Sequence, residues 1–171
     1  NYMDEEVEIE RGLVKPFLMG KDVHRYEPAK ARNVVIFPYT IQNGKAELMS
    51  QSYIKNNFPM GWDYLKQNRQ ALGDRERGRM HGDEFYAYIY PKNLTEFETI
   101  KIMTPDICGK PEMSIDLTGE LYHTTTIYSF AFKPNLHKNP KFFLGLLNSK
   151  VMWYFLCATG TPLRGDYRRF K

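Results

Sequence analysis

Residues 139–160 constrain the fold most strongly, because they carry start and stop signals for two consecutive helices. Asn139 followed by Pro140 is a favoured helix start, with Asn as the N-cap and Pro in the first turn. Ser149 is suited to cap a second helix that runs through Ala158, and Gly160 is suited to end it. A helical pair therefore closes the chain, and the rest of the fold must pack against it.

The segments before this pair alternate between helix and strand patterns. Residues 46–56 and 62–72 favour helices, with a break at 57–61. Strands are expected at residues 33–39, where Pro38 ends the strand, and at 85–90, 99–103, 112–117 and 126–132. This order predicts an α+β fold, with a mixed β-sheet packed against helices. A length of 171 residues fits one domain.

The charge of the chain is unevenly distributed. Five acidic residues and no basic residue occur in the first ten positions, and without them the net charge rises from +4 to +9. Residues 1–12 are therefore expected to form an acidic linker. A basic body indicates partners that carry phosphate, although an ordinary basic surface would give the same composition.

Several compartments and protein classes are disfavoured by the sequence. Cys108 and Cys157 lie 49 residues apart without metal-ligand spacing, which favours a reduced compartment, the cytoplasm. The acidic start does not resemble a signal peptide, and no apolar run is long enough to span a membrane. The chain begins at Asn1 and stops within a basic run, so we expect a piece of a longer protein, truncated at its C-terminus.

Catalytic signatures are largely missing from the sequence. It contains no Gly-rich phosphate loop, no GxSxG elbow and no HExxH pair. Asp106 and Glu112 could share a metal ion in a nuclease, but position 114 is Ser where such sites need Lys. A turn around Asp106 is the simpler interpretation. We therefore expect no catalytic site and no metal site in this chain.

Basic and aromatic residues gather in three segments instead. The first segment contains Lys15, Lys21, His24, Arg25 and Tyr26, and the second contains Arg69, Arg75, Arg77 and Arg79 among acidic neighbours. The third is the closing Gly-rich segment, which presents Arg164, Tyr167, Arg168, Arg169 and Lys171. Arginine can grip guanine through two hydrogen bonds, and lysine neutralises phosphates. These segments favour a nucleic-acid interface, although the second could be a self-paired helix end.

An ordered series of motifs runs along most of the chain. The series comprises Val14-Lys-Pro-Phe-Leu-Met-Gly-Lys-Asp-Val-His-Arg-Tyr26, Val35-Ile-Phe-Pro-Tyr39, Trp62-Asp-Tyr-Leu-Lys66, Tyr90-Pro-Lys92, Lys101-Ile-Met-Thr-Pro-Asp106, His123-Thr-Thr-Thr-Ile-Tyr128, Phe143-Leu-Gly-Leu-Leu-Asn-Ser-Lys150 and Arg164-Gly-Asp-Tyr-Arg-Arg-Phe-Lys171. This series resembles the TaqI-like C-terminal specificity domain of adenine-N6 DNA methyltransferases and fused restriction–modification enzymes. One departure is Met19, which stands where the family more often has Arg.

The resemblance implies a target-recognition domain over residues 13–171 that reads double-stranded DNA beside an upstream methyltransferase domain. That parent enzyme would bind S-adenosylmethionine and methylate a flipped adenine, and a fused nuclease would use Mg²⁺. The implied DNA-binding candidates are Arg164, Tyr167, Arg168, Arg169, Lys171, Lys15, Lys21, His24, Arg25, Arg77, Arg79 and Lys92.

Two further expectations accompany this interpretation. Tyr167 is the aromatic residue most expected to meet DNA, whereas five apolar residues of the closing helices are expected in the core. These five are Phe142, Leu146, Val151, Trp153 and Phe155. The alternative interpretation is a protein-interaction domain that docks another subunit of a restriction–modification complex.

Overall fold

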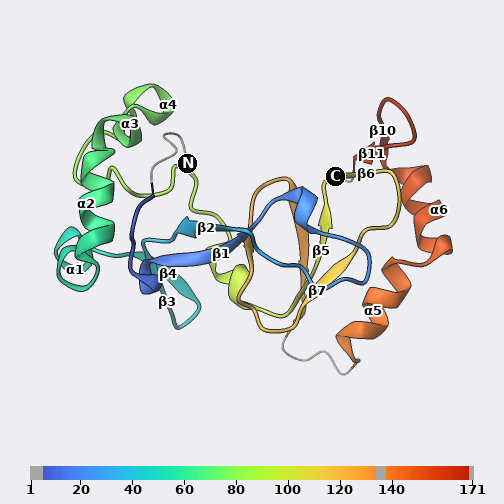
Figure 1. Cartoon of the computed structure of the whole chain (residues 1–171). Helices are drawn as coiled ribbons and strands as arrows, with labels where there is room; N and C mark the ends of the chain where they lie inside the picture. The colour runs from blue at the N-terminus through green and yellow to red at the C-terminus, as the bar shows by residue number, and fades with distance from the viewer. Residues whose placement is uncertain (1–5, 134–137, 170–171) are drawn as a thin grey trace. The chain divides into compact units, whose positions relative to one another are not determined.

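The computed structural model describes residues 6–133 and 138–169, and it confirms the α+β class (Figure 1). The helices are α1 (Gln51–Asn57), α2 (Pro59–Gln67), α3 (Arg69–Gly73), α4 (Arg75–Gly78), α5 (Pro140–Leu147) and α6 (Lys150–Thr159). The strands are β1 (Val14–Leu18), β2 (Asn33–Ile36), β3 (Tyr39–Gln42), β4 (Lys45–Leu48), β5 (Lys101–Pro105), β6 (Ile107–Cys108), β7 (Ser114–Asp116), β8 (Tyr122–His123), β9 (Ile127–Ala131), β10 (Thr161–Pro162) and β11 (Arg168–Arg169). Short 3-10 helices are η1 (Arg11–Leu13), η2 (Gly20–Asp22) and η3 (Leu94–Glu98).

The chain divides into two compact units, neither of which is continuous in sequence. Unit 1 comprises Asn1–Lys15 and Val35–Thr95, and unit 2 comprises Pro16–Val34 and Glu96–Lys171. The boundary falls inside strands β1 and β2, which belong to the sheet of order β2-β1-β8. The assignment of residues 1–12 as a linker stays a prediction. The end of that segment contributes to unit 1, since the Glu10 carboxylate accepts hydrogen bonds from the Met60 and Gly61 amides at 2.8 and 2.9 Å.

Unit 1 combines the β3–β4 hairpin with helices α1 to α4. Its core contains Leu13, Ile54, Trp62, Leu65, Phe85 and Tyr86. The expected helix at 46–56 is wrong in its first part, because residues 46–48 belong to β4. Asn43 and Gly44 form the hairpin turn with φ values of 52° and 72°, which suits an Asn-Gly pair, and α1 begins only after the Ser50 cap.

The expected strand at 85–90 is also wrong, since this segment forms turns. The Arg75 guanidinium donates hydrogen bonds to the carbonyl oxygens of Phe85 and Ala87 at 2.6 and 3.1 Å. It also donates through Nε to the Leu72 carbonyl at 2.7 Å. In a strand, the carbonyl groups of Phe85 and Ala87 would accept hydrogen bonds from a neighbouring strand. Here the Arg75 side chain satisfies both. Burial lowers the pKa of Arg75.

Unit 2 is built around strand β5, whose five residues are all buried. β5 pairs antiparallel with β7 on one side and β9 on the other, so that Ile102 lies opposite both Ile115 and Phe130. These strands confirm three of the expected segments, those at 99–103, 112–117 and 126–132. Strand β1 pairs in parallel with β8, with Phe17 opposite Tyr122.

The helical pair α5–α6 has the predicted caps. Asn139 Oδ1 accepts from the Lys141 amide at 2.9 Å, and Ser149 Oγ accepts from the Met152 amide at 3.2 Å. Among the described residues no single helix has the length and apolar character to cross a membrane. α5 and α6 meet those criteria only as a pair, and the pair is bent by 64°.

The prediction that five apolar residues of this pair lie in the core is wrong for four of them. Phe142, Leu146, Val151 and Phe155 are exposed, and Trp153 is half-buried. Both helices are apolar on all sides, so only one face of each can pack against the sheet. The inner face carries Phe143, Leu144, Leu147 and Leu156, which pack with Ile102 and Met113.

Candidate nucleic-acid interface

The closing segment folds as a small hairpin whose tip carries two exposed candidates. β10 pairs antiparallel with β11, and the Leu163 amide donates to the Tyr167 carbonyl at 3.0 Å. Gly165 adopts φ +74° in this turn, a conformation that favours glycine. Arg164 and Tyr167 are exposed at the tip, and Tyr167 keeps 53% of its surface accessible.

Arg168 and Arg169 hold the base of this hairpin. Their strand, β11, also pairs antiparallel with β6. Arg168 donates through Nε to the Cys157 carbonyl at 3.4 Å and through Nη1 to the Tyr167 carbonyl at 3.0 Å. Arg169 Nε lies 3.9 Å from Asp106 Oδ2. Both arginines are half-buried, so their first role is to anchor the loop that presents Arg164 and Tyr167.

The opening motif contributes the short helix η2 and the turn after it. Lys21 and His24 are exposed there. The Met19 amide donates to Asp22 Oδ2 at 2.8 Å, which fixes the start of η2. Arg25 has an internal partner, because Nη2 donates to the Asn148 carbonyl at 2.6 Å. That guanidinium also lies 5.0 Å from the centre of the Tyr26 ring.

Three contacts connect the opening motif to the closing hairpin within unit 2. The Gly20 amide donates to Thr126 Oγ1 at 3.2 Å, and the Asp106 amide donates to the Thr126 carbonyl at 2.9 Å. Asp106 in turn faces Arg169. The structure thus links Gly20–Asp22, Thr126, Asp106 and residues 161–169, and we call this region the unit-2 edge.

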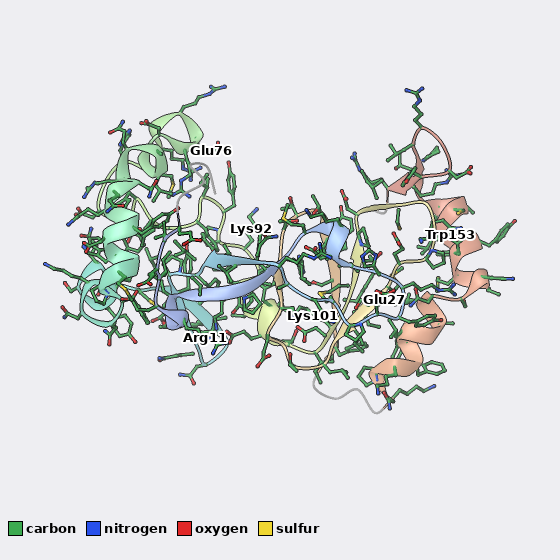
Figure 2. The ribbon with its side chains drawn as sticks, viewed as in Figure 1. Arg11, Glu27, Glu76, Lys92, Lys101 and Trp153 are labelled. Carbon is green, nitrogen blue, oxygen red and sulfur yellow. The ribbon has the colours of Figure 1, made fainter. Side chains whose placement is uncertain are left out.

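Four candidates lie in unit 1 instead. Arg77, Arg79 and Lys92 are exposed, and the Lys15 ammonium lies 5.9 Å from the centre of the Phe37 ring. Figure 2 labels Lys92 and also Glu76, on α4. Glu76 and Arg77 both have left-handed backbone, with φ of 51° and 62°, and such strain is found preferentially at functional loops. The remaining candidate, Lys171, lies outside the described residues.

The carboxylates considered for a metal site are paired with cations. Asp106 faces Arg169, and Glu112 Oε1 lies 3.5 Å from the Lys110 ammonium. Within residues 6–133 and 138–169 no three His, Cys, Asp or Glu side chains are grouped so that they could hold a metal ion. Burial, reinforced by Glu112 and Asp106, raises the pKa of the nearby Cys108 thiol to about 12.

Residues that no sequence motif indicates also contribute to this edge. Lys110 is an exposed cation, and the Tyr167 ring packs close to Gly109, beside it. Thr126 and Asp106 connect the two motifs. No local pattern identifies these residues, because their importance depends on contacts across 20 to 106 positions of sequence, as with Gly20 and Thr126.

A comparison with protein families finds a match that covers nearly the whole chain. Residues 15–171 match the TaqI-like C-terminal specificity domain. No curated protein matches the chain. The match includes both motifs of the unit-2 edge and the exposed cations of unit 1. Because it covers nearly the whole sequence, the chain belongs to the TaqI-like C-terminal specificity domain family.

Proposed function

We propose that this domain recognises a specific sequence in duplex DNA for a restriction–modification enzyme, and that it positions the target adenine for N6 methylation by an upstream methyltransferase domain. The observation that carries the proposal is the membership of residues 15–171 in a family of specificity domains. The exposed cations and the exposed Tyr167 of the unit-2 edge support it, since DNA interfaces are rich in positive charge.

The closing hairpin is the element best suited to enter a groove. A two-stranded β-ribbon fits the major groove, where each base pair presents its own pattern of donors and acceptors. Arg164 at the tip reads a base or binds a phosphate, and Tyr167 contributes an aromatic ring beside it. Lys21 and Lys110 neutralise neighbouring phosphates, whereas Arg168 and Arg169 keep the hairpin in position.

In this proposal, other domains of the parent enzyme catalyse methylation and, where a nuclease is fused, DNA cleavage. S-adenosylmethionine supplies the methyl group, and Mg²⁺ serves a nuclease where one is fused. The described residues offer no cluster that fits a metal ion. We place the parent enzyme in the bacterial cytoplasm, where it acts on DNA as part of a defence system.

The test is fluorescence anisotropy with a mixed-sequence duplex of about 30 base pairs, titrated across a salt series. Binding should weaken steeply with salt, and Arg164→Ala should lower the log–log slope by about 0.9 if the side chain contacts one phosphate. Arg32→Ala, at an exposed position outside the unit-2 edge, is the matched control. Enrichment of one sequence from a random pool should follow for the unsubstituted protein. A lack of duplex binding at low salt would contradict the proposal.

A further inference from the structure

Helix α6 presents an apolar stripe to the solvent. Val151, Tyr154, Phe155 and Ala158 follow the i, i+3, i+4, i+7 pattern of one helix face, and all four are exposed. Val151 and Tyr154 keep 80% and 78% of their surface accessible. The other side of α6, which includes Trp153, labelled in Figure 2, is half-buried. A helix that is apolar on all sides is normally covered on all sides.

Helix α5 and the neighbouring sheet extend this apolar surface. Phe142 and Leu146, at positions i and i+4 of α5, are exposed as well. We call the exposed residues of both helices the outer helix face. They are Phe142, Leu146, Val151, Tyr154, Phe155 and Ala158. On the inner side of the pair, a groove of about 380 Å³ lies between β9 and the two helices, lined by Tyr128, Phe130, Leu147 and Leu156 among others. Large apolar patches on soluble domains mark interaction sites.

The two helices themselves carry charge of a single sign. Residues 138–159 contain no Asp and no Glu, and their cations are Lys138, Lys141 and Lys150. The Lys138 ammonium lies 5.1 Å from the centre of the Phe142 ring, so positive charge directly adjoins the apolar residues. A second copy of the chain would bring lysines against lysines. An acidic partner would be complementary in charge.

We infer that the outer helix face docks an amphipathic helix of a partner protein, whose apolar stripe is flanked by Asp and Glu. Two helices pack by fitting the side-chain ridges of one apolar face into the grooves of the other, and α6 offers such a face with i, i+3, i+4 and i+7 spacing. Protein is favoured over DNA because Val151 and Leu146 are aliphatic, whereas DNA interfaces are polar and strongly cationic. This surface is distinct from the unit-2 edge and goes beyond the proposed DNA recognition.

The experiment uses a labelled designed helix of roughly 18 residues, about five turns, with Leu on one face and Glu on both flanks. Anisotropy should show binding to the protein, and a peptide with Lys in place of every Glu should not bind. Val151→Ser with Tyr154→Ser should weaken binding at least about tenfold, which corresponds to about 1.4 kcal/mol. Lys141→Glu with Lys150→Glu should reverse the preference between the two peptides.

The matched control is Val34→Ser with Tyr53→Ser, which changes two exposed residues of the same types elsewhere. This control should leave peptide binding intact, and circular dichroism should show that both double variants are folded. Duplex DNA binding should be unchanged by Val151→Ser with Tyr154→Ser, so that this inference and the proposed function fail separately.

Four outcomes would overturn the inference. Equal binding of the Glu and Lys peptides, or no binding of the Glu peptide at about 1 mM, a concentration that corresponds to a binding free energy of only about −4 kcal/mol, would rule out an acidic partner helix. Loss of duplex binding in Val151→Ser with Tyr154→Ser would assign the face to DNA. Binding of the protein to phosphatidylglycerol vesicles that this variant abolishes would assign it to a membrane. Dimerisation that the variant abolishes would assign it to a second copy.

Discussion

Lys101 and Asp116 form a buried ion pair in the sheet of unit 2, where they lie directly opposite each other on β5 and β7. Lys101 Nζ donates to Asp116 Oδ2 at 2.7 Å and to the Phe97 carbonyl at 2.6 Å, and its side chain is labelled in Figure 2. Burial lowers the pKa of Lys101, whereas the hydrogen bond to Asp116 opposes that shift. For Asp116, burial alone would raise the pKa, but Lys101 and the amides of Leu121 and Thr118 hold it below its ordinary value.

Lys101→Met should destabilise the protein strongly, because it leaves the Asp116 carboxylate buried without its cation. Removing one partner of a buried pair costs about 3–5 kcal/mol. Urea unfolding measures the change in the free energy of unfolding. Lys110→Met, which removes an exposed lysine paired with Glu112 at 3.5 Å, should cost less than about 1 kcal/mol. Equal costs for the two variants would contradict the buried-pair account.

His123 should make stability depend on pH. Burial lowers the pKa of His123 and the charge of Lys101 lowers it further, while the hydrogen bond to the Thr124 carbonyl opposes both. Within the described residues His123 Nε2 is buried without a hydrogen-bond partner. The unfolded chain therefore takes up the proton first, with a pKa of about 6.5, and stability falls as the pH drops below that value.

The expected loss is at most about 1.4 kcal/mol per pH unit for this one proton. His123→Gln should remove that slope between about pH 7 and pH 5, measured by urea unfolding at each pH. His24→Gln, at an exposed position, should leave the slope in place. A slope that survives in His123→Gln would assign the pH dependence to other groups.

At the scale of elements, the junction between α5 and α6 explains the Leu-Leu-Asn-Ser-Lys motif. The fully buried Asn148 side chain bonds both backbone groups of Met113, since it accepts from the amide and donates to the carbonyl, each at 3.0 Å. Arg25 binds the Asn148 carbonyl, and Ser149 begins the next helix. The side-chain amide of Asn148 thus connects the helical pair to the segment before β7.

Asn148→Ala should cost about 2–4 kcal/mol, because it removes two hydrogen bonds and leaves the buried Met113 amide unsatisfied, while the Met113 carbonyl keeps its bond from the Tyr26 amide at 3.1 Å. Ser149→Ala removes only the cap of α6 and should cost about 1 kcal/mol. Thermal or urea unfolding compares the two variants. A smaller loss for Asn148→Ala than for Ser149→Ala would show that the bridge to Met113 is unimportant.

The elements predictable from sequence are those with local signals at their ends. The Asn139 and Ser149 caps located α5 and α6, and clusters of turn-forming Gly, Pro, Asn and Asp residues on either side located β5 and β9. The Asn43-Gly44 pair is a sequence signal for a β-hairpin turn. It predicts a strand directly after it, where the helix pattern of residues 46–56 predicted a helix. The segment at 85–90 could not be predicted as a turn, because the contact that shapes it comes from Arg75.

The candidate interface was predictable in composition but not in the use of each side chain. Basic residues of the closing segment were found, yet the division between exposed Arg164 and anchoring Arg169 depends on Asp106, which is distant in sequence. Similarly, apolar periodicity could not distinguish the inner from the outer face of α6, since both faces are apolar. Burial of such a helix is decided by its neighbours.

At the scale of the whole molecule, each unit carries its own exposed cations. Arg164→Ala in unit 2 and Arg77→Ala in unit 1 should each lower the salt slope of duplex binding by about 0.9 if each side chain contacts one phosphate. The double variant should lose about twice that amount if the two side chains contact DNA independently, because independent sites act additively. Anisotropy across a salt series measures all three variants. A normal slope in Arg77→Ala would remove Arg77 from the phosphate contacts.

The chain crosses the boundary between the units within β1, within β2 and after Thr95. Most of unit 1, Val35–Thr95, is therefore one continuous cassette inserted between two parts of unit 2. Genetic exchange between related genes can move that cassette intact only with two crossovers, one near each of its ends. A single crossover inside it, between α2 and Arg75, would join α1 and α2 of one parent to Arg75, Phe85 and Tyr86 of another. Ile54, Trp62 and Leu65 share one core with Phe85 and Tyr86, so the two parents' residues would have to fit together to yield a folded protein.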